Sequence, residues 1–216
     1  MYDLVIFDLD GTLVNTLDDL ADSCNEVLSV MGYPVHSTAA YRYFVGNGLA
    51  KLAERALPED HRTDEDIRRF CEGFDIAYGR LYNNKSRPYD GMTGLVSDLA
   101  RAGIKTAVAS NKPDAFTKKI ISEMFGDVFS LVRGNLPPVP KKPDPAILLS
   151  IMKELAVPCD RVLMVGDSGV DIQTAANAGT DSAGCTWGFR PREEFEENGA
   201  GYIADSPEEL YSIITR

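Results

Sequence analysis

Three carboxylates stand where they could act together on one ligand. Asp8 and Asp10 lie two residues apart, directly after an apolar run, and Asp167 follows a second apolar run far along the chain. None of them has a basic partner in its local sequence, and crowding like charges is costly unless a cation is present. Hard oxygen ligands without a nearby His or Cys select Mg²⁺, so the pattern predicts a magnesium site.

A phosphate group would account for the other polar residues at comparable positions. Ser110 offers a hydroxyl donor, Asn111 an amide donor and Lys142 a point charge, all suited to phosphate oxygens. Gly11 and Thr12 offer backbone N–H groups in a tight turn, which is a further anion-binding feature. Together with the metal site, these residues predict binding of a phosphate ester.

The chemistry expected of such a site is hydrolysis in two steps. One carboxylate attacks phosphorus to give an aspartyl-phosphate, which divides a difficult reaction into two easier ones. Mg²⁺ would hold the nucleophile and a phosphoryl oxygen together and screen the repulsion between two anions. Asp10 is placed to give a proton to the leaving oxygen and later to take one from water.

The elements that must position these residues alternate between strands and helices. Apolar, β-rich runs predict strands over 2–7, 104–109, 128–132, 162–165, 181–186 and 201–204. Helical patterns lie between them, over 113–124, from Asp144-Pro145 onward and from the Ser206-Pro207 start. This alternation predicts an α/β fold with a doubly wound, mostly parallel sheet. Ligands of such sheets bind beyond the carboxyl ends of the strands, where three strands here deliver their polar residues.

One stretch breaks the alternation. Residues 15–84 show helical periods only, with helices expected from Thr16 to Gly32, over 48–57 and from Thr63. The stretch is too long for a loop, so it predicts an all-helical cap domain inserted into a core formed by residues 1–14 and 85–216.

The composition of the chain argues against several classes of protein and binding partner. The 216 residues include 22 Lys and Arg against 33 Asp and Glu, a formal charge of −11, and 44% are hydrophobic. A disordered chain is thereby excluded, and the acidic balance argues against nucleic-acid or anionic-membrane binding. No run approaches the ~20 apolar residues of a membrane helix, and the N-terminus lacks a signal-peptide pattern. With four cysteines and no C-x-x-C pair, we expect reduced thiols and a cytoplasmic protein. The sequence is compatible with a monomer or a homodimer.

Four short motifs then resemble those of a known family, the haloacid dehalogenase-like hydrolases. They occur in the family order: Asp8-Leu9-Asp10-Gly11-Thr12-Leu13, Ser110-Asn111-Lys112, Lys142-Pro143-Asp144-Pro145 and Gly166-Asp167-Ser168-Gly169-Val170-Asp171. The helical insert stands at the place of the family's type 1 cap, and the resemblance implies a Rossmann-like core. Two shorter stretches, 45–48 and 186–189, resemble the phosphoglycolate phosphatase subgroup.

The resemblance implies a role for each acidic residue. Asp8 would be the nucleophile and Asp10 the general acid and base. Mg²⁺ would be held by the side chains of Asp8 and Asp167 and by the backbone carbonyl of Asp10. Asp171 would either bind the metal through water or orient Lys142.

The resemblance also implies how substrate is bound. Ser110 and Lys142 match the phosphate binders of the family. The cap segment from Val45 to Lys51 combines a Gly-Asn-Gly turn with a lysine, so we expect Asn47 and Lys51 to select a small anionic phosphate ester such as 2-phosphoglycolate. The alternative for Asn47 is a plain turn before a helix.

Other functions fit parts of this pattern. A pyrophosphatase or a sugar-phosphate mutase or phosphatase would share both the core and the cap type. A dehalogenase of the family would lack the second Asp, so Asp10 argues against it. A receiver-like signalling module also carries a phosphorylated Asp and Mg²⁺, but it has no helical insert after its first strand and no built-in acid such as Asp10.

Overall fold

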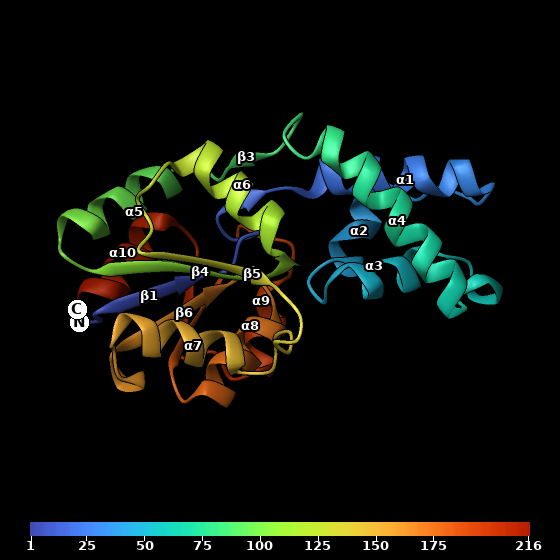
Figure 1. Ribbon diagram of the computed structural model, residues 1–216. Helices are drawn as coiled ribbons and strands as arrows, with labels where there is room; N and C mark the ends of the chain where they lie inside the picture. Colours follow the sequence, from blue (N-terminus) through green and yellow to red (C-terminus); the bar gives the residue numbers. More distant parts are fainter. The chain divides into compact units, whose positions relative to one another are not determined.

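A six-stranded parallel sheet forms the centre of the larger of two compact units in the computed structural model, which describes residues 1–216 (Figure 1). This core unit comprises Met1–Val14 and Pro88–Arg216, and the second unit comprises Asn15–Arg87. The strand order is β5-β4-β1-β6-β7-β8. The strands are β1 (Leu4–Phe7), β4 (Lys105–Pro113), β5 (Leu131–Asn135), β6 (Val162–Gly166), β7 (Asp181–Cys185) and β8 (Tyr202–Ala204).

The order of the strands reverses beside β1. From β1 the chain builds β4 and β5 on one side, and it then crosses to build β6, β7 and β8 on the other. Phe7, the last residue of β1, pairs with Val108 of β4 and Val165 of β6. A sheet of this topology has its ligand crevice where the order reverses, beyond the carboxyl ends of the strands. Asp8 and Asp10 follow β1 at that point, which confirms the predicted α/β, doubly wound fold class.

Helices cover both faces of the sheet, with α5 and α6 on one face and α7 and α8 on the other (Figure 1). The C-terminal helix α10 packs on α5. The helices of the core are α5 (Met92–Arg101), α6 (Asp114–Phe125), α7 (Ala146–Leu155), α8 (Gly169–Ala178), α9 (Arg192–Glu197) and α10 (Pro207–Thr215), with a 3₁₀ turn at Cys159–Arg161. None of the helices in the structure is both long and apolar enough to cross a membrane.

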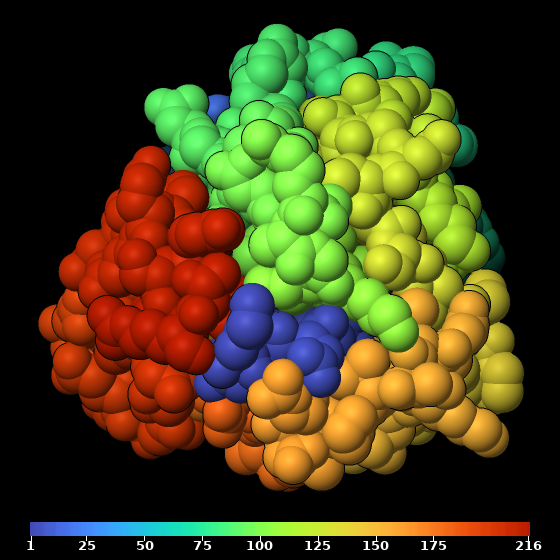
Figure 2. Space-filling view, turned by 90° about the vertical axis from the view of Figure 1, so that its left-hand side faces the viewer, coloured from blue at the N-terminus to red at the C-terminus, as the bar shows by residue number.

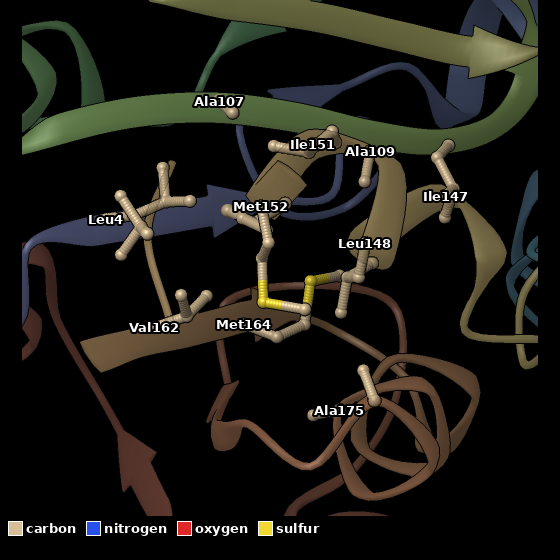
Figure 3. Close-up of a cluster of buried hydrophobic side chains, with 13 residues drawn as sticks. Leu4, Ala107, Ala109, Ile147, Leu148, Ile151, Met152, Val162, Met164 and Ala175 are labelled. Atoms are coloured by element: carbon tan, nitrogen blue, oxygen red, sulfur yellow. The ribbon is translucent and has the colours of Figure 1, made fainter. Parts of the chain in front are cut away.

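A hydrophobic cluster holds α7 and α8 on the sheet (Figure 3). Met152 of α7 and Met164 of β6 lie side by side, and Leu148 and Ile151 pack from the same helix. These residues are buried, and each large apolar side chain removed from water contributes roughly 1.5–3 kcal/mol. The cluster therefore fixes the sheet whose strand ends carry the polar residues.

The amino-terminal ends of the strands lie among neighbouring segments of the core. In Figure 2 the N-terminal segment (blue) lies between the C-terminal helix (red), the α5 region (green) and the α7 region (orange). The amide of Tyr2 donates to the Ile214 carbonyl at 3.3 Å, and that of Asp3 to the Arg161 carbonyl at 2.9 Å. These backbone hydrogen bonds join the start of the chain to neighbouring segments at this end of the sheet. The motif carboxylates lie at the opposite end.

The second unit is helical, as residues 15–84 predict. Its helices are α1 (Leu17–Met31), α2 (Thr38–Phe44), α3 (Leu49–Ala56) and α4 (Asp64–Leu81), with a 3₁₀ turn at Glu59–His61. Thr63 and Asp66 form a capping box at the start of α4, and Gly32 ends α1 in the left-handed conformation. Two short strands, β2 (Val14–Asn15) and β3 (Arg87–Pro88), pair where the chain leaves the core unit and returns to it.

Several elements differ from the sequence expectation. Strand β4 runs on through the polar residues to Pro113, and its pairing with β5 is irregular between Ala109 and Pro113. Strand β5 begins at Leu131 instead of Val128, and Phe129 in the preceding loop packs edge-on against Phe7. The structure also has helices α2, α5 and α9, which the sequence reading did not identify.

Helix α7 begins at Ala146 with Pro145 at its N-cap, one position later than the expected Asp144 cap. The Asp144 carboxylate still accepts the Ala146 amide at 2.9 Å, so it serves the first turn from outside the helix.

Candidate active site

A buried lysine joins the first and last motifs. Lys142 Nζ lies 3.0 Å from Asp8 Oδ1 and 2.7 Å from Asp171 Oδ1. The side chains of Lys142 and Asp171 are each 1% exposed. Burial alone would lower the pKa of Lys142, but the carboxylates of Asp171 and Asp8 outweigh it and raise the pKa. Lys142 therefore stays an ammonium ion in the crevice.

Asp8 is buried beside this ammonium. Burial raises the pKa of Asp8 to about 7, against the lowering effect of Lys142. The Leu9 amide donates to Asp8 Oδ1 at 2.7 Å, so two donors meet at the same oxygen. These contacts fix the orientation of the carboxylate.

Asp171 has two fixed partners. One oxygen accepts from Lys142, and the other accepts from the amide and hydroxyl of Ser168, at 3.2 and 2.7 Å, as the capping box of α8. A Cβ at Gly166 would lie 2.2 Å from the Asp171 Cβ, so this close approach requires glycine. Of the two roles expected for Asp171, the geometry favours orienting Lys142.

Asp167 is held by neutral donors. The Phe189 amide donates to Oδ2 at 2.8 Å and the Thr12 hydroxyl to Oδ1 at 3.4 Å. Burial, together with the charges of Asp171 and Asp8, raises the pKa of Asp167 well above its ordinary value of 3.8. This carboxylate is thus fixed in place without an ammonium partner at hydrogen-bond distance.

The turn after Asp10 has a different role from the one expected. The amide of Gly11 donates to Val14 O at 2.9 Å and that of Thr12 to Leu9 O at 3.3 Å, so both close the turn itself. Gly11 has φ +87°, and a Cβ there would lie 2.1 Å from Asp167 Oδ2. In the structure Gly11 makes room for Asp167 and Thr12 orients it, instead of presenting amides to an anion.

Asn111 and Ser110 lie on strand β4, inside the extension that the sequence reading missed. The Asn111 side chain donates to Lys142 O at 3.0 Å and accepts the Lys142 amide at 2.8 Å, so it clamps the backbone of the lysine. The hydroxyl of Ser110 accepts the Lys112 amide at 3.2 Å, which leaves its own proton to donate. Ser110 keeps the donor expected for a phosphate oxygen, whereas the Asn111 side chain positions Lys142.

Asp10 also has a buried lysine as partner. Lys112 Nζ lies 3.0 Å from Asp10 Oδ1 and 3.2 Å from Oδ2. The exposed fractions of the two side chains are 4% for Lys112 and 18% for Asp10. Each carboxylate of the Asp-x-Asp pair therefore has its own ammonium ion.

The remaining charges suit a divalent cation. Asp8, Asp167 and Asp171 are buried, and each offers an oxygen within 4.8 Å of the other two. With Asp10, four carboxylates face the two ammonium groups of Lys112 and Lys142, which leaves two negative charges when all are ionised. An all-oxygen donor set with this excess charge fits Mg²⁺ and does not favour a softer metal.

The two expected cap residues lie in the helical unit. Asn47 is half-buried in the bend between Gly46 and Gly48, both of which have positive φ. Lys51 of α3 pairs with Glu54 at 2.7 Å on an exposed surface, with 46% of its side chain accessible. Neither residue has a contact that identifies a ligand.

Comparison with known proteins agrees with the motifs and the fold. A family model described as haloacid dehalogenase-like hydrolase matches residues 5–185. The chain therefore belongs to the haloacid dehalogenase-like hydrolase family. Among its relatives is the phosphoglycolate phosphatase of Vibrio parahaemolyticus, 34% identical over 98% of this chain and 95% of that protein. The phosphoglycolate phosphatase of Pseudomonas syringae pv. tomato is 37% identical over 94% of this chain and 76% of the relative.

Solved structures show the same fold along the whole chain. A protein from Lactobacillus delbrueckii, 29% identical, superposes with a TM-score of 0.93 over 99% of this chain and 98% of its own. A predicted phosphoglycolate phosphatase from Haemophilus somnus is 30% identical, with a TM-score of 0.91 and coverage of 98% and 97%.

Sequence reasoning missed three contributors to this site. Lys112 contacts Asp10, a role that its place in the second motif does not predict. Trp187 donates its indole N–H to Thr12 O at 3.1 Å, and Phe189 donates its amide to Asp167. The stretch 186–189 was noted from the subgroup resemblance, but nothing in its sequence showed that it folds over the fourth motif.

Proposed function

We propose that this protein is a Mg²⁺-dependent phosphatase that hydrolyses a small phosphate monoester, with 2-phosphoglycolate as its substrate. The observation that carries the proposal is the convergence of all four motifs on one crevice, with Asp8 held between a buried lysine and two further carboxylates. The names of the relatives that match nearly the whole chain support the substrate.

Asp8 is the proposed nucleophile. Its carboxylate attacks phosphorus, the ester P–O bond breaks, and the electron pair leaves with the alcohol oxygen. Asp10 donates a proton to that oxygen. Asp10 then takes a proton from water, which attacks the aspartyl-phosphate and releases phosphate with the Asp8 carboxylate restored.

The other residues hold the phosphate and the charges. The Ser110 hydroxyl and Lys142 bind phosphoryl oxygens, and Asn111 keeps Lys142 in position. Mg²⁺, held by Asp8, Asp167 and the backbone carbonyl of Asp10, would supply charge screening between the anionic nucleophile and the anionic ester.

The helical unit is the proposed cap. Its two connections leave the core just after the first motif and return at Pro88, where the Tyr89 amide donates to Leu13 O at 3.1 Å. A cap attached there can exclude water during turnover. Asn47 and Lys51 are its proposed contacts to the carboxylate of the substrate, and Lys51 would exchange Glu54 for that carboxylate.

A phosphate-release screen tests the proposed function. The panel contains 2-phosphoglycolate, pyrophosphate, a hexose phosphate and 4-nitrophenyl phosphate, each with Mg²⁺ and with a chelator. We expect the highest kcat/KM for 2-phosphoglycolate and loss of turnover with the chelator. Preference for pyrophosphate or the hexose phosphate would contradict the substrate, and persistence of the acyl phosphate without turnover would favour a signalling module.

The cap residues have their own test. Asn47→Ala and Lys51→Ala should lower kcat/KM for 2-phosphoglycolate much more than for 4-nitrophenyl phosphate, which lacks the carboxylate. Arg68→Ala, which removes another exposed ion-paired cation from the same unit, is the matched control. Equal losses on both substrates would show that segment 45–51 is a turn and a solvated helix face.

A further inference from the structure

The ion pair between Lys112 and Asp10 has a geometry that a general role in stability does not require. The ammonium contacts both carboxylate oxygens, at 3.0 and 3.2 Å, so it fixes the rotation of the carboxylate as well as its distance. The pair joins the end of β4 to the loop after β1, which are 102 residues apart in sequence. Burying a lysine gives little net stability compared with an apolar side chain of similar size.

The backbone of Lys112 is itself fixed in place. Its amide donates to the Ser110 hydroxyl at 3.2 Å, and its carbonyl accepts from the Thr117 hydroxyl at 3.2 Å. The ammonium is therefore aimed at Asp10 from a rigid strand end, as a residue that sets another residue's position must be.

We propose that Lys112 is the positioning residue for Asp10 and keeps its carboxylate directed at the leaving oxygen and then at the attacking water. The proposal rests on the proposed function, since it concerns the proton transfers of that reaction. Lys142 has the corresponding task for Asp8, so the two carboxylates are oriented independently by two buried lysines.

Leaving-group dependence provides the test. Lys112→Met keeps the length of the side chain and removes the charge. The rate of the first step, formation of the aspartyl-phosphate, is measured in single turnovers, because the second step is the same for every ester. We expect this rate to fall about 10- to 100-fold for 2-phosphoglycolate, within the range of a general acid–base contribution. The loss of the same rate for 4-nitrophenyl phosphate, whose leaving group needs no proton, should stay below about threefold, with KM changed less than about twofold for both. Lys112→Arg should restore part of the lost rate.

Two controls separate positioning from general damage. Lys118→Met removes a lysine from another Lys–Asp ion pair, an exposed one with Asp114 on α6, and should leave both activities unchanged. In an Asp10→Asn background, Lys112→Met should cause no further loss on 2-phosphoglycolate, because residues that act through one another are not additive.

Several outcomes would overturn the proposal. These are equal losses on both esters, an effect mainly on KM, or full additivity with Asp10→Asn. A crystal structure of Lys112→Met gives a readout without turnover: a displaced Asp10 carboxylate supports the proposal, and an unchanged one contradicts it. Absence of phosphatase activity in the wild-type protein would instead count against the proposed function, and the position of Asp10 would still decide the role of Lys112.

Discussion

Replacement of Lys142 by methionine tests how much the free energy of unfolding depends on this one buried cation. The variant keeps the bulk of the side chain but leaves Asp8 and Asp171, 11% and 1% exposed, without their shared ammonium. Breaking a buried ion pair by removing one partner costs roughly 3–5 kcal/mol. We expect a loss of this size in the free energy of unfolding, measured by urea denaturation at pH 8 with a chelator present.

The neighbouring residue provides a matched control. Lys141 is exposed, so Lys141→Met should change the free energy of unfolding by less than about 0.5 kcal/mol. A deficit below about 1 kcal/mol in Lys142→Met, or an equal deficit in both variants, would refute the reasoning.

The deficit should also depend on pH. A carboxyl group whose pKa is higher in the folded state makes folding less favourable as pH rises from the unfolded to the folded value. Asp8 is such a group, with a pKa of about 7 against an ordinary 3.8, and losing Lys142 removes the charge that lowers it. Lys142 itself stays charged below its ordinary pKa of 10.5 and adds no slope in this range. We expect the deficit to be smallest near about pH 5 and to grow above about pH 7; a flat profile would contradict this account.

Three further predictions concern the metal and the nucleophile. Asp8→Asn should lower turnover by at least about 10³-fold in a phosphate-release assay, and near-normal turnover would exclude the covalent mechanism. Gly188→Ala would place a Cβ 2.2 Å from the Asp167 Cβ and so displace that carboxylate. The Mg²⁺ concentration for half-maximal activity should therefore rise about 10- to 100-fold. The control Gly126→Ala, at a glycine with positive φ but with nothing within 4 Å of the added Cβ, should not change it. Because Asp8 and Asp167 have raised pKa values, Mg²⁺ should raise the melting temperature more at about pH 8 than at about pH 5.5, and an equal shift at both would argue against binding at these carboxylates.

The strands of the parallel sheet could be located from the sequence because they are the most apolar segments of the chain. Residues 4–7 and 162–165 are fully buried, so their composition differs sharply from the flanking polar motifs. In such a topology the residue after each strand lies in the crevice, which is why Asp8 and Asp167 could be placed from position alone. The helix start at Thr63 could also be predicted, since the capping box that Thr63 forms with Asp66 is a local interaction. Thr16 also precedes a helix, α1, although its side chain makes no capping hydrogen bond there.

The partners of these residues depend on distant parts of the chain and could not be predicted. The apolar run of β4 ends at Ala109, although the strand continues to Pro113 through residues whose side chains serve the site. Nothing local indicates that Asn111 meets the backbone of Lys142, 31 residues away, or that Lys112 meets Asp10. The short polar helix α9 gave no periodic signal, because Phe195 is its only buried residue.

The distribution of positive charge explains where a divalent cation would act. Lys142 and Lys112 satisfy Asp8 and Asp10, each through contacts of about 3 Å. Asp167 instead contacts a hydroxyl and a backbone amide, which orient a carboxylate without neutralising it. The charge of Arg190 lowers the pKa of Asp167, but Arg190 forms its ion pair with Glu194. A dication between Asp167 and Asp8 would therefore bind at the least compensated charge of the crevice. The two lysines would remain with the carboxylates they orient, so metal binding and proton transfer would use separate parts of the same acidic cluster.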